Sequence, residues 1–314
     1  MITKEDLRKH IDYLYSELFD VKSHLFNYSI TDTTKSAYIN GHIAWVLSTL
    51  GEREKSKSLI QGMRESKLFD DKSGLLRYSA TNDRPKNSDK NFGANLSFLR
   101  ALYLNNDIEL ADKHLKLLYE NFFNKEKGLF CRSERDNLLF VAQPNLWMVD
   151  LLVQSGKISD AKDLYAEIVK QFYDEKIGLV VSKSSTTAGK YKTDYIFPDD
   201  NALFIKVANY LDKEMAENVK NKLLRSPLYS SEECLFNKKM NIETGKVDRI
   251  KSLYKNAVCI FMLTELIPIE IGKVRESFVK NLFDIENKRF SETFADSLFL
   301  SLLAVYSDQS LDHH

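Results

Sequence analysis

The chain has 314 residues, 43% of them apolar, and its 45 Lys and Arg side chains balance 45 Asp and Glu, so the formal net charge is zero. That balance gives no sign of the clustered basic charge that nucleic-acid binding needs, so no nucleic-acid partner is expected. The apolar content is enough for a large core, and the scarcity of glycine (11) and proline (5) predicts a mostly helical chain.

The cysteines and the apolar segments of the sequence indicate the cellular compartment in which the protein is expected. Cys131, Cys234 and Cys259 are far apart and form no CxxC or Cys/His pattern, which indicates a reducing cytoplasm and no metal site. The charged N-terminus lacks the apolar centre of a signal peptide. The most apolar run, 257–269, is too short and too broken to span a bilayer. No membrane association is expected, and without a Gly-rich phosphate loop no cofactor is expected either.

A short motif recurs along the chain. Its clearest copy is FDDKSGLL, beginning at Phe69, and an aromatic residue followed by Asp or Asn opens each copy. The aromatic residues are Phe19, Phe69, Phe123, Tyr173, Phe236 and Phe283. A near-constant period of this size predicts one supersecondary unit used six times.

Each repeat contains two helical patterns. In chain order the predicted helices cover residues 4–18, 34–50, 52–67, 91–104, 107–121, 143–155, 157–171, 199–211, 212–225, 251–267, 270–281 and 292–306. The first helix of each pair is charged and amphipathic, which predicts a half-exposed outer helix. The second is apolar nearly all round, which predicts a buried inner helix.

Alternating outer and inner helices with short returns predict antiparallel hairpins. Hairpins can stack as an open solenoid or close into a ring. In an open solenoid one face of the inner helices would be wet, and these inner helices have no polar face. We therefore predict an all-α fold, an (α/α)6 toroid of six helical hairpins joined by FDxxxGL-type turns, in one domain spanning residues 1–314.

Six hairpins with FDxxxGL-type turns resemble the six-hairpin glycosidase superfamily, which includes unsaturated glucuronyl and rhamnogalacturonyl hydrolases and, as relatives, sugar 2-epimerases. The resemblance covers the whole chain and is one of architecture. It implies a hydrolase-like, carbohydrate-active enzyme that takes a small saccharide, acidic ones included, in the toroid cavity. Two alternatives stay open: a sugar epimerase or isomerase, and a non-catalytic helical-repeat protein that binds a peptide or protein. The oligomeric state is not predicted.

The loops before the inner helices are long, so binding is expected at the N-terminal ends of those helices. Polar residues recur there at one level: Asn40, Asn95, Asn145, Asn201, Asn256 and Asp296. One interpretation is a polar ring that hydrogen-bonds sugar hydroxyls. The alternative is local capping, because Asn and Asp are favoured at helix starts.

The fourth long loop delivers three acids, Asp194, Asp199 and Asp200, together with Tyr195, which is a candidate substrate ligand. Two adjacent carboxylates push their pKa values apart, which is the division of labour that glycoside hydrolysis needs. The run DDNALF, beginning at Asp199, is similar to the stretch that bears a catalytic aspartate in the glucuronyl and rhamnogalacturonyl hydrolases, which implies a catalytic role for this pair. The alternative is a helix start, with acids favoured by the dipole after Pro198.

Three further residues are candidate substrate ligands. Gln143 and Trp147 lie at the start of an inner helix, where an exposed indole would stack on a pyranose. His42 is a candidate acid or base, as in the epimerase relatives. For both rings the alternative is core packing. The position of a second catalytic carboxylate stays open among Asp32, Asp89, Asp136 and Asp296.

Overall fold

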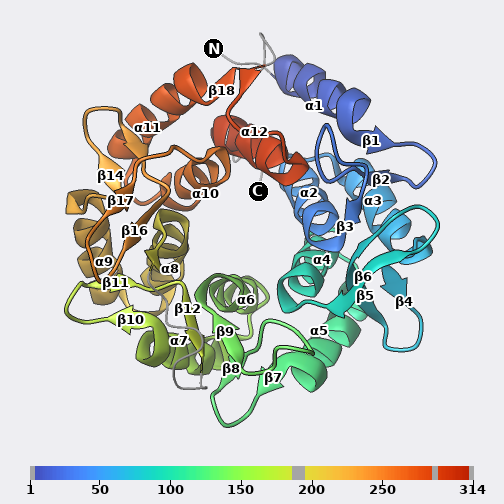
Figure 1. Cartoon of the computed structure of the whole chain (residues 1–314), viewed down its shortest axis with the longest axis horizontal. Helices are drawn as coiled ribbons and strands as arrows, with labels where there is room; N and C mark the ends of the chain where they lie inside the picture. The colour runs from blue at the N-terminus through green and yellow to red at the C-terminus, as the bar shows by residue number, and fades with distance from the viewer. Residues whose placement is uncertain (1–3, 186–194, 285–288, 311–314) are drawn as a thin grey trace. The chain divides into compact units, whose positions relative to one another are not determined.

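The computed structural model describes residues 4–185, 195–284 and 289–310, which form twelve α-helices (Figure 1). The helices are α1 (Lys4–Leu18), α2 (Ala37–Thr49), α3 (Arg53–Glu65), α4 (Phe92–Leu104), α5 (Ile108–Phe122), α6 (Ala142–Gln154), α7 (Ile158–Phe172), α8 (Pro198–Leu211), α9 (Lys213–Arg225), α10 (Leu253–Leu263), α11 (Pro268–Asn281) and α12 (Ala295–Ser310). Each begins within three residues of its predicted start. No helix among the described residues combines the length and the apolar content needed to cross a membrane.

The strands are short and belong to the connections. They are β1 (Phe19–Asp20), β2 (Leu25–Phe26), β3 (Lys35–Ser36), β4 (Phe69–Asp70), β5 (Leu75–Ala80), β6 (Pro85–Lys90), β7 (Phe123–Asn124), β8 (Leu129–Phe130), β9 (Leu139–Val141), β10 (Tyr173–Asp174), β11 (Leu179–Val180), β12 (Lys183–Ser185), β13 (Tyr195–Ile196), β14 (Tyr229–Ser230), β15 (Leu235–Phe236), β16 (Lys239–Asn241), β17 (Val247–Asp248), β18 (Phe283–Asp284) and β19 (Arg289–Phe290).

The outer and inner helices differ in burial as the sequence pattern predicts. In α7 the buried side chains recur every three or four residues, and the others face water. In α4 the side chains from Ala94 to Leu102 are all buried. The inner helices therefore form the core, and each outer helix covers one side of it.

The repeated motif is a two-stranded antiparallel β-hairpin between each outer helix and its inner helix. Gly74, Gly128 and Gly178 have positive φ at the end of the turn, where a side chain would be strained. His24 and Cys234 hold the same position with φ of 54° and 50°. The fifth hairpin corrects the sequence analysis, because its first strand begins at Tyr229 and Phe236 lies on the second strand.

One asparagine in the first turn of each of five inner helices holds the neighbouring β-hairpin. Its Oδ1 accepts the backbone N–H of the second strand's last or second residue at 2.8 Å in all five cases. Its Nδ2 donates two hydrogen bonds. One goes to the carbonyl of that same strand residue, and the other goes to the carbonyl of the residue four positions before the asparagine. We call these the latch asparagines: Asn40, Asn95, Asn145, Asn201 and Asn256. In α12 the corresponding place is taken by Leu298.

Replacing the latch residue Asn95 with alanine should lower the free energy of unfolding by about 2–3 kcal/mol, because it leaves the buried N–H and C=O of Leu76 without partners. Asn121→Ala on the exposed side of α5 is the matched control and should change stability by less than about 0.5 kcal/mol. Urea unfolding of both variants measures the difference. Equal changes in the two variants would show that the latch contributes nothing.

The chain divides into two compact units. The first contains the described residues of Met1–Phe122, Ser133–Arg135 and Glu292–His314. In it the inner helix α2 packs against both α4 and α12. The outer helix α1 packs on α12, α3 packs on α2, and α5 packs on α4. The two ends of the described chain therefore meet, as the blue α1 and red α12 of Figure 1 show. The hydroxyl of Tyr306 lies 2.6 Å from Nδ1 of His10 across this contact.

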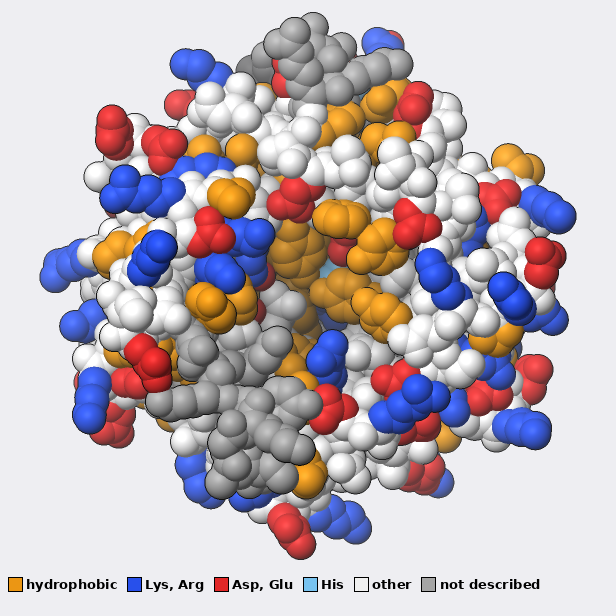
Figure 2. All heavy atoms as spheres, viewed as in Figure 1, with side chains coloured by type: hydrophobic (Ala, Val, Ile, Leu, Met, Phe, Trp, Pro, Cys, Tyr) orange, Lys and Arg blue, Asp and Glu red, His pale blue; other side chains and the backbone are white. Residues whose placement is uncertain are grey.

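The second unit contains the described residues of Phe123–Arg132 and Asp136–Ser291. Its inner helices α6, α8 and α10 pack in that order, and α7, α9 and α11 cover them. A three-stranded sheet, β13–β16–β17, lies in the connections to α8 and α10. Acidic and basic side chains are interspersed over the face drawn in Figure 2.

Candidate active site

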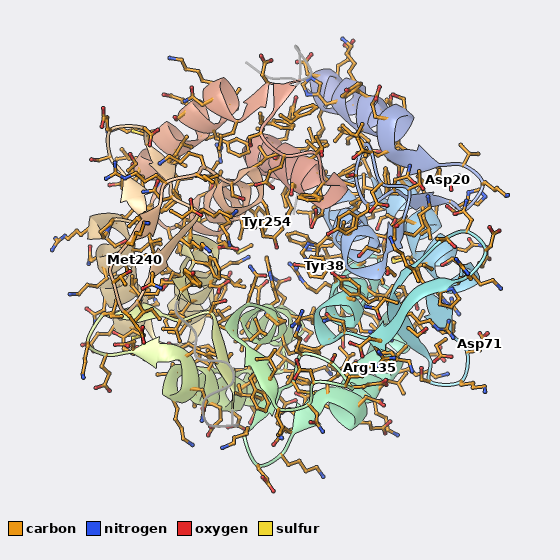
Figure 3. The ribbon with its side chains drawn as sticks, in the orientation of Figure 1. Asp20, Tyr38, Asp71, Arg135, Met240 and Tyr254 are labelled. Atoms are coloured by element: carbon orange, nitrogen blue, oxygen red, sulfur yellow. The ribbon has the colours of Figure 1, made fainter. Side chains whose placement is uncertain are left out.

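The first turns of three neighbouring inner helices in the second unit carry polar side chains in one register. Counting back two residues from the latch asparagines of α6, α8 and α10 gives Gln143, Asp199 and Tyr254. Because α6 packs against α8 and α8 against α10, the three positions lie at one level. Tyr254 is labelled on α10 in Figure 3.

Asp199 connects the three helices. Nε2 of Gln143 donates to its Oδ2 at 2.8 Å, and Nζ of Lys255 donates to its Oδ1 at 2.7 Å. The carboxylate of Asp199 is fully buried and the side chain of Lys255 is 15% exposed. A carboxylate without water needs a paired charge and further hydrogen bonds, and here Lys255 and Gln143 supply both.

The charge of Lys255 is maintained by two acids. Burial alone lowers the pKa of Lys255, but the charges of Asp199 and Asp200 outweigh burial and raise it above its usual value. Lys255 is therefore an ammonium group at neutral pH. Asp200 is 2% exposed. One cation thus serves two adjacent buried acids.

Cys259 lies one turn along α10 from Lys255. Burial raises the pKa of its thiol well above the usual value, and Asp199 adds to the rise. The thiolate is the nucleophilic form of cysteine, so a thiol held protonated in this way is not a nucleophile at neutral pH. The chemistry available at this level rests on the two aspartates.

Aromatic rings lie beside this network. Nζ of Lys255 is 3.9 Å from the ring centroid of Phe197, the residue that precedes α8. The rings of Phe197 and Tyr195 are stacked with centroids 6.5 Å apart. Tyr195 is 38% exposed, so this predicted ligand lies where a solute can reach it.

A second polar pair lies seven residues further along α6 and α8. Nζ of Lys206 is 3.5 Å from Oδ1 of Asp150, whose Oδ2 accepts from Nε2 of Gln154 at 2.8 Å. Asp150 is 1% exposed. The lower level thus pairs one acid with Lys206, whereas at the upper level Lys255 interacts with both Asp199 and Asp200.

In the first unit, the ring of His42 contacts that of Tyr38 in a tilted arrangement, with the centroids 4.2 Å apart (Tyr38 is labelled in Figure 3). Its Nδ1 is buried and has no hydrogen-bond partner among the described residues. Burial, and to a smaller extent the charge of Arg100, lower the pKa of His42 to about 3. The imidazole is therefore neutral at neutral pH.

Asp296 is the acid of α12 two residues before Leu298, which is the register of Asp199 in α8. Burial raises the pKa of Asp296 to about 6; the backbone N–H of Ser297, which donates to Oδ1 at 2.8 Å, opposes the rise, and Glu292 adds to it. The shared register puts an acid at the same place in two hairpins.

Asp296→Asn should stabilise the protein near pH 7.5 and have little effect near pH 4. The folded-state pKa of about 6 exceeds the ordinary 3.8, so the stability that Asp296 contributes is fully present below about pH 3.8 and is lost as the pH rises through 6. Asparagine keeps the oxygen that accepts from Ser297 and cannot ionise. Urea unfolding at about pH 4, 5.5 and 7.5 should show a difference from wild type that grows with pH. A difference that does not change with pH would contradict the assignment.

Several sequence predictions are corrected. Asn40, Asn95, Asn145, Asn201 and Asn256 are fully buried and use both amide donors on backbone carbonyls, so they hold hairpins and offer no donor to a hydroxyl. Trp147 is 3% exposed and packs in the core of α6, which leaves no face for a pyranose. Asp194 lies outside the described residues. Gln143, Asp199 and Asp200 are brought together.

Sequence reasoning missed Lys255, Tyr254 and Phe197. A usable signal was present, because the latch asparagines recur at a fixed place in each inner helix. Counting back from Asn256 by one and two residues gives Lys255 and Tyr254, as counting back from Asn201 gives the two aspartates.

No family model matches the sequence, and no curated protein matches it. Solved structures do match. A D-mannose isomerase is 14% identical over 98% of both chains, with a TM-score of 0.74. Cellobiose 2-epimerase from Bacillus thermoamylovorans is 12% identical over 96% of this chain and 98% of that one, with a TM-score of 0.71. An α-1,6-mannanase of Salegentibacter, in complex with α-1,6-mannotriose, is 14% identical over 96% of this chain and 98% of that one, with a TM-score of 0.65.

The fold is the (α/α)6 toroid. The predicted fold class is confirmed, and the resemblance to six-hairpin glycosidases is confirmed at the level of the fold. The solved toroids named above are carbohydrate-active enzymes by their titles. The residues of the candidate site lie at the N-terminal ends of the inner helices α6, α8 and α10.

Proposed function

We propose that residues 1–314 form one domain that is a carbohydrate-active enzyme and hydrolyses a glycosidic bond in a small saccharide. The observation that carries this is the network of Gln143, Asp199 and Lys255 with Asp200 beside it. It brings two adjacent acids and the ammonium group of Lys255 together at the first turns of α6, α8 and α10. The free thiols of Cys131, Cys234 and Cys259 support a cytoplasmic enzyme.

A solved toroid supports the choice of residues. The mannanase structure with mannotriose is an inactive variant in which two adjacent aspartates are replaced by asparagine. That protein thus also has an aspartate pair whose loss accompanies loss of activity. In this chain the adjacent acids at the start of α8 are Asp199 and Asp200.

The two aspartates are in different surroundings, which suggests different roles. Glycoside hydrolysis needs a group that protonates the leaving oxygen and a carboxylate that assists the attack of water. Both oxygens of Asp199 are engaged, one by an ammonium and one by an amide, so we assign it the part of the charged carboxylate. Asp200 is then the group that exchanges a proton with the substrate.

The test is a hydrolysis screen with the purified protein. The panel contains α-1,6-mannooligosaccharides, β-linked gluco- and xylo-oligosaccharides, α-glucans and unsaturated uronides, and products are separated by anion-exchange chromatography. We expect a shorter saccharide from at least one substrate, and its formation should depend on Asp200. A panel without any product would count against the hydrolase.

A second candidate function is a sugar isomerase or epimerase. The observation in its favour is His42, whose Nδ1 is buried beside Tyr38 without a hydrogen-bond partner among the described residues. Against it, a pKa of about 3 makes His42 a weak base. The same chromatograms decide, because isomerisation changes a monosaccharide or a reducing end without shortening the chain, and that product should disappear in His42→Gln.

A further inference from the structure

The strand β16 places a lysine on the face of an exposed tyrosine. β13 and β16 pair antiparallel, with Tyr195 opposite Asn241 and Ile196 opposite Met240 (labelled in Figure 3). This register brings Nζ of Lys239 to 3.9 Å from the ring centroid of Tyr195. Contact with the negative face of an aromatic ring holds an ammonium group in place and leaves its N–H donors available.

The charge of Lys239 is not neutralised by a carboxylate among the described residues. Two other lysines of the same unit do pair with carboxylates: Lys251 with Glu233 at 2.5 Å and Lys255 with Asp199 at 2.7 Å. Asp248 lies opposite Lys239 in the register of β16 and β17, but its Oδ1 accepts from the backbone N–H of Ile250. Lys239 is therefore a positioned cation whose counter-ion is not among these residues.

Lys239 is connected to the candidate site by a continuous set of contacts. The ring of Tyr195 is stacked on that of Phe197, and Phe197 in turn contacts Lys255, which holds Asp199. Every member belongs to the second unit. A ligand that reaches Asp199 and extends along the two rings would bring one end to Lys239.

We propose that Lys239 and Tyr195 form a subsite for an anionic group, a carboxylate or a phosphate, carried by the saccharide. This inference rests on the proposed function and specifies its substrate class. A lysine ammonium acts as a point charge toward either anion. Because Lys239 is only half-buried, water and salt partly screen its attraction to a bound anion, so its contribution to the binding free energy is modest.

Binding of single sugars tests the subsite without requiring turnover. Dissociation constants are measured by calorimetry for D-glucuronate, D-glucose 6-phosphate and D-glucose, and for D-mannose 6-phosphate and D-mannose. We expect at least one anionic sugar to bind about tenfold more tightly than its neutral parent at low salt. The glucuronate and phosphate arms show which anion is preferred. Lys239→Gln should abolish the preference, and added salt should weaken it.

Lys238→Gln is the matched control, because it removes the same charge from the residue that precedes β16, whereas it is Nζ of Lys239 that lies over the ring of Tyr195. It should leave the preference intact. Equal binding of charged and neutral sugars, no binding of any sugar, or an equal loss in both lysine variants would overturn the subsite. Hydrolysis of a saccharide by a protein that binds charged and neutral sugars equally would overturn the subsite and leave the proposed function standing. If the protein preferred anionic sugars through Lys239 but hydrolysed no saccharide, the subsite would stand and the proposed hydrolase function would be overturned.

Discussion

Replacing Asp200 with asparagine is expected to lower turnover by ~10²–10⁴-fold while the substrate still binds, because asparagine keeps the shape of the side chain and cannot exchange a proton. Asp199→Asn is expected to act differently. Its single amide oxygen can replace only one of the two carboxylate oxygens that accept from Gln143 and Lys255, and the charge that Lys255 balances is lost. We therefore expect Asp199→Asn to change the affinity for substrate more than the catalytic step.

The comparison needs a control that makes the same chemical change elsewhere. Asp163→Asn lies on the exposed side of α7 and should leave both kcat and KM unchanged. Initial rates over a range of substrate concentrations separate the two parameters. Full turnover in the double variant Asp199→Asn, Asp200→Asn would remove this pair from the active site.

Lys255→Met is expected to lower the free energy of unfolding by about 3–5 kcal/mol, because it leaves Asp199 and Asp200 buried without their shared cation. Methionine keeps much of the length of the lysine side chain, so the loss reports the charge more than the packing. Urea unfolding at neutral pH measures it.

Lys220→Met is the control for this effect. Lys220 pairs with the exposed Glu217 within α9, and its loss should cost less than about 1 kcal/mol. Asp199→Asn combined with Lys255→Met should be less destabilised than Lys255→Met alone, because one buried charge has been removed. If Lys255→Met were as mild as Lys220→Met, or if the second substitution gave no recovery, the ion pair would not be the source of stability.

The fold could be predicted from the sequence because its signals are local and repeated. The helical periods of α5 and α7 are visible in single windows, and the aromatic-Asp motif marks each hairpin. The fifth hairpin was misplaced because Ser230 stands where the other copies have Asp or Asn, while the Phe236–Asn237 pair that follows resembles the motif.

The site was predicted only in part because its contacts join residues far apart in the chain. Asp199 bonds Gln143 and Lys255, each 56 residues away, and no local pattern shows such a pairing. The latch asparagines misled for a different reason. A polar residue at the start of a helix can bind a ligand, cap the helix or hold a neighbouring β-hairpin. Only the hydrogen-bond partners distinguish these roles, as those of the Asn95 amide show.

The latch asparagines also bear on how the chain finds its fold. Each lies only 14 to 21 residues from the strand residue that it bonds. Closing loops of this length costs little chain entropy, and contacts between near neighbours in sequence favour rapid folding. We therefore expect each β-hairpin and the inner helix that follows it to form as a separate local nucleus. The slow step of folding should be the assembly of these units through the long-range contacts between inner helices.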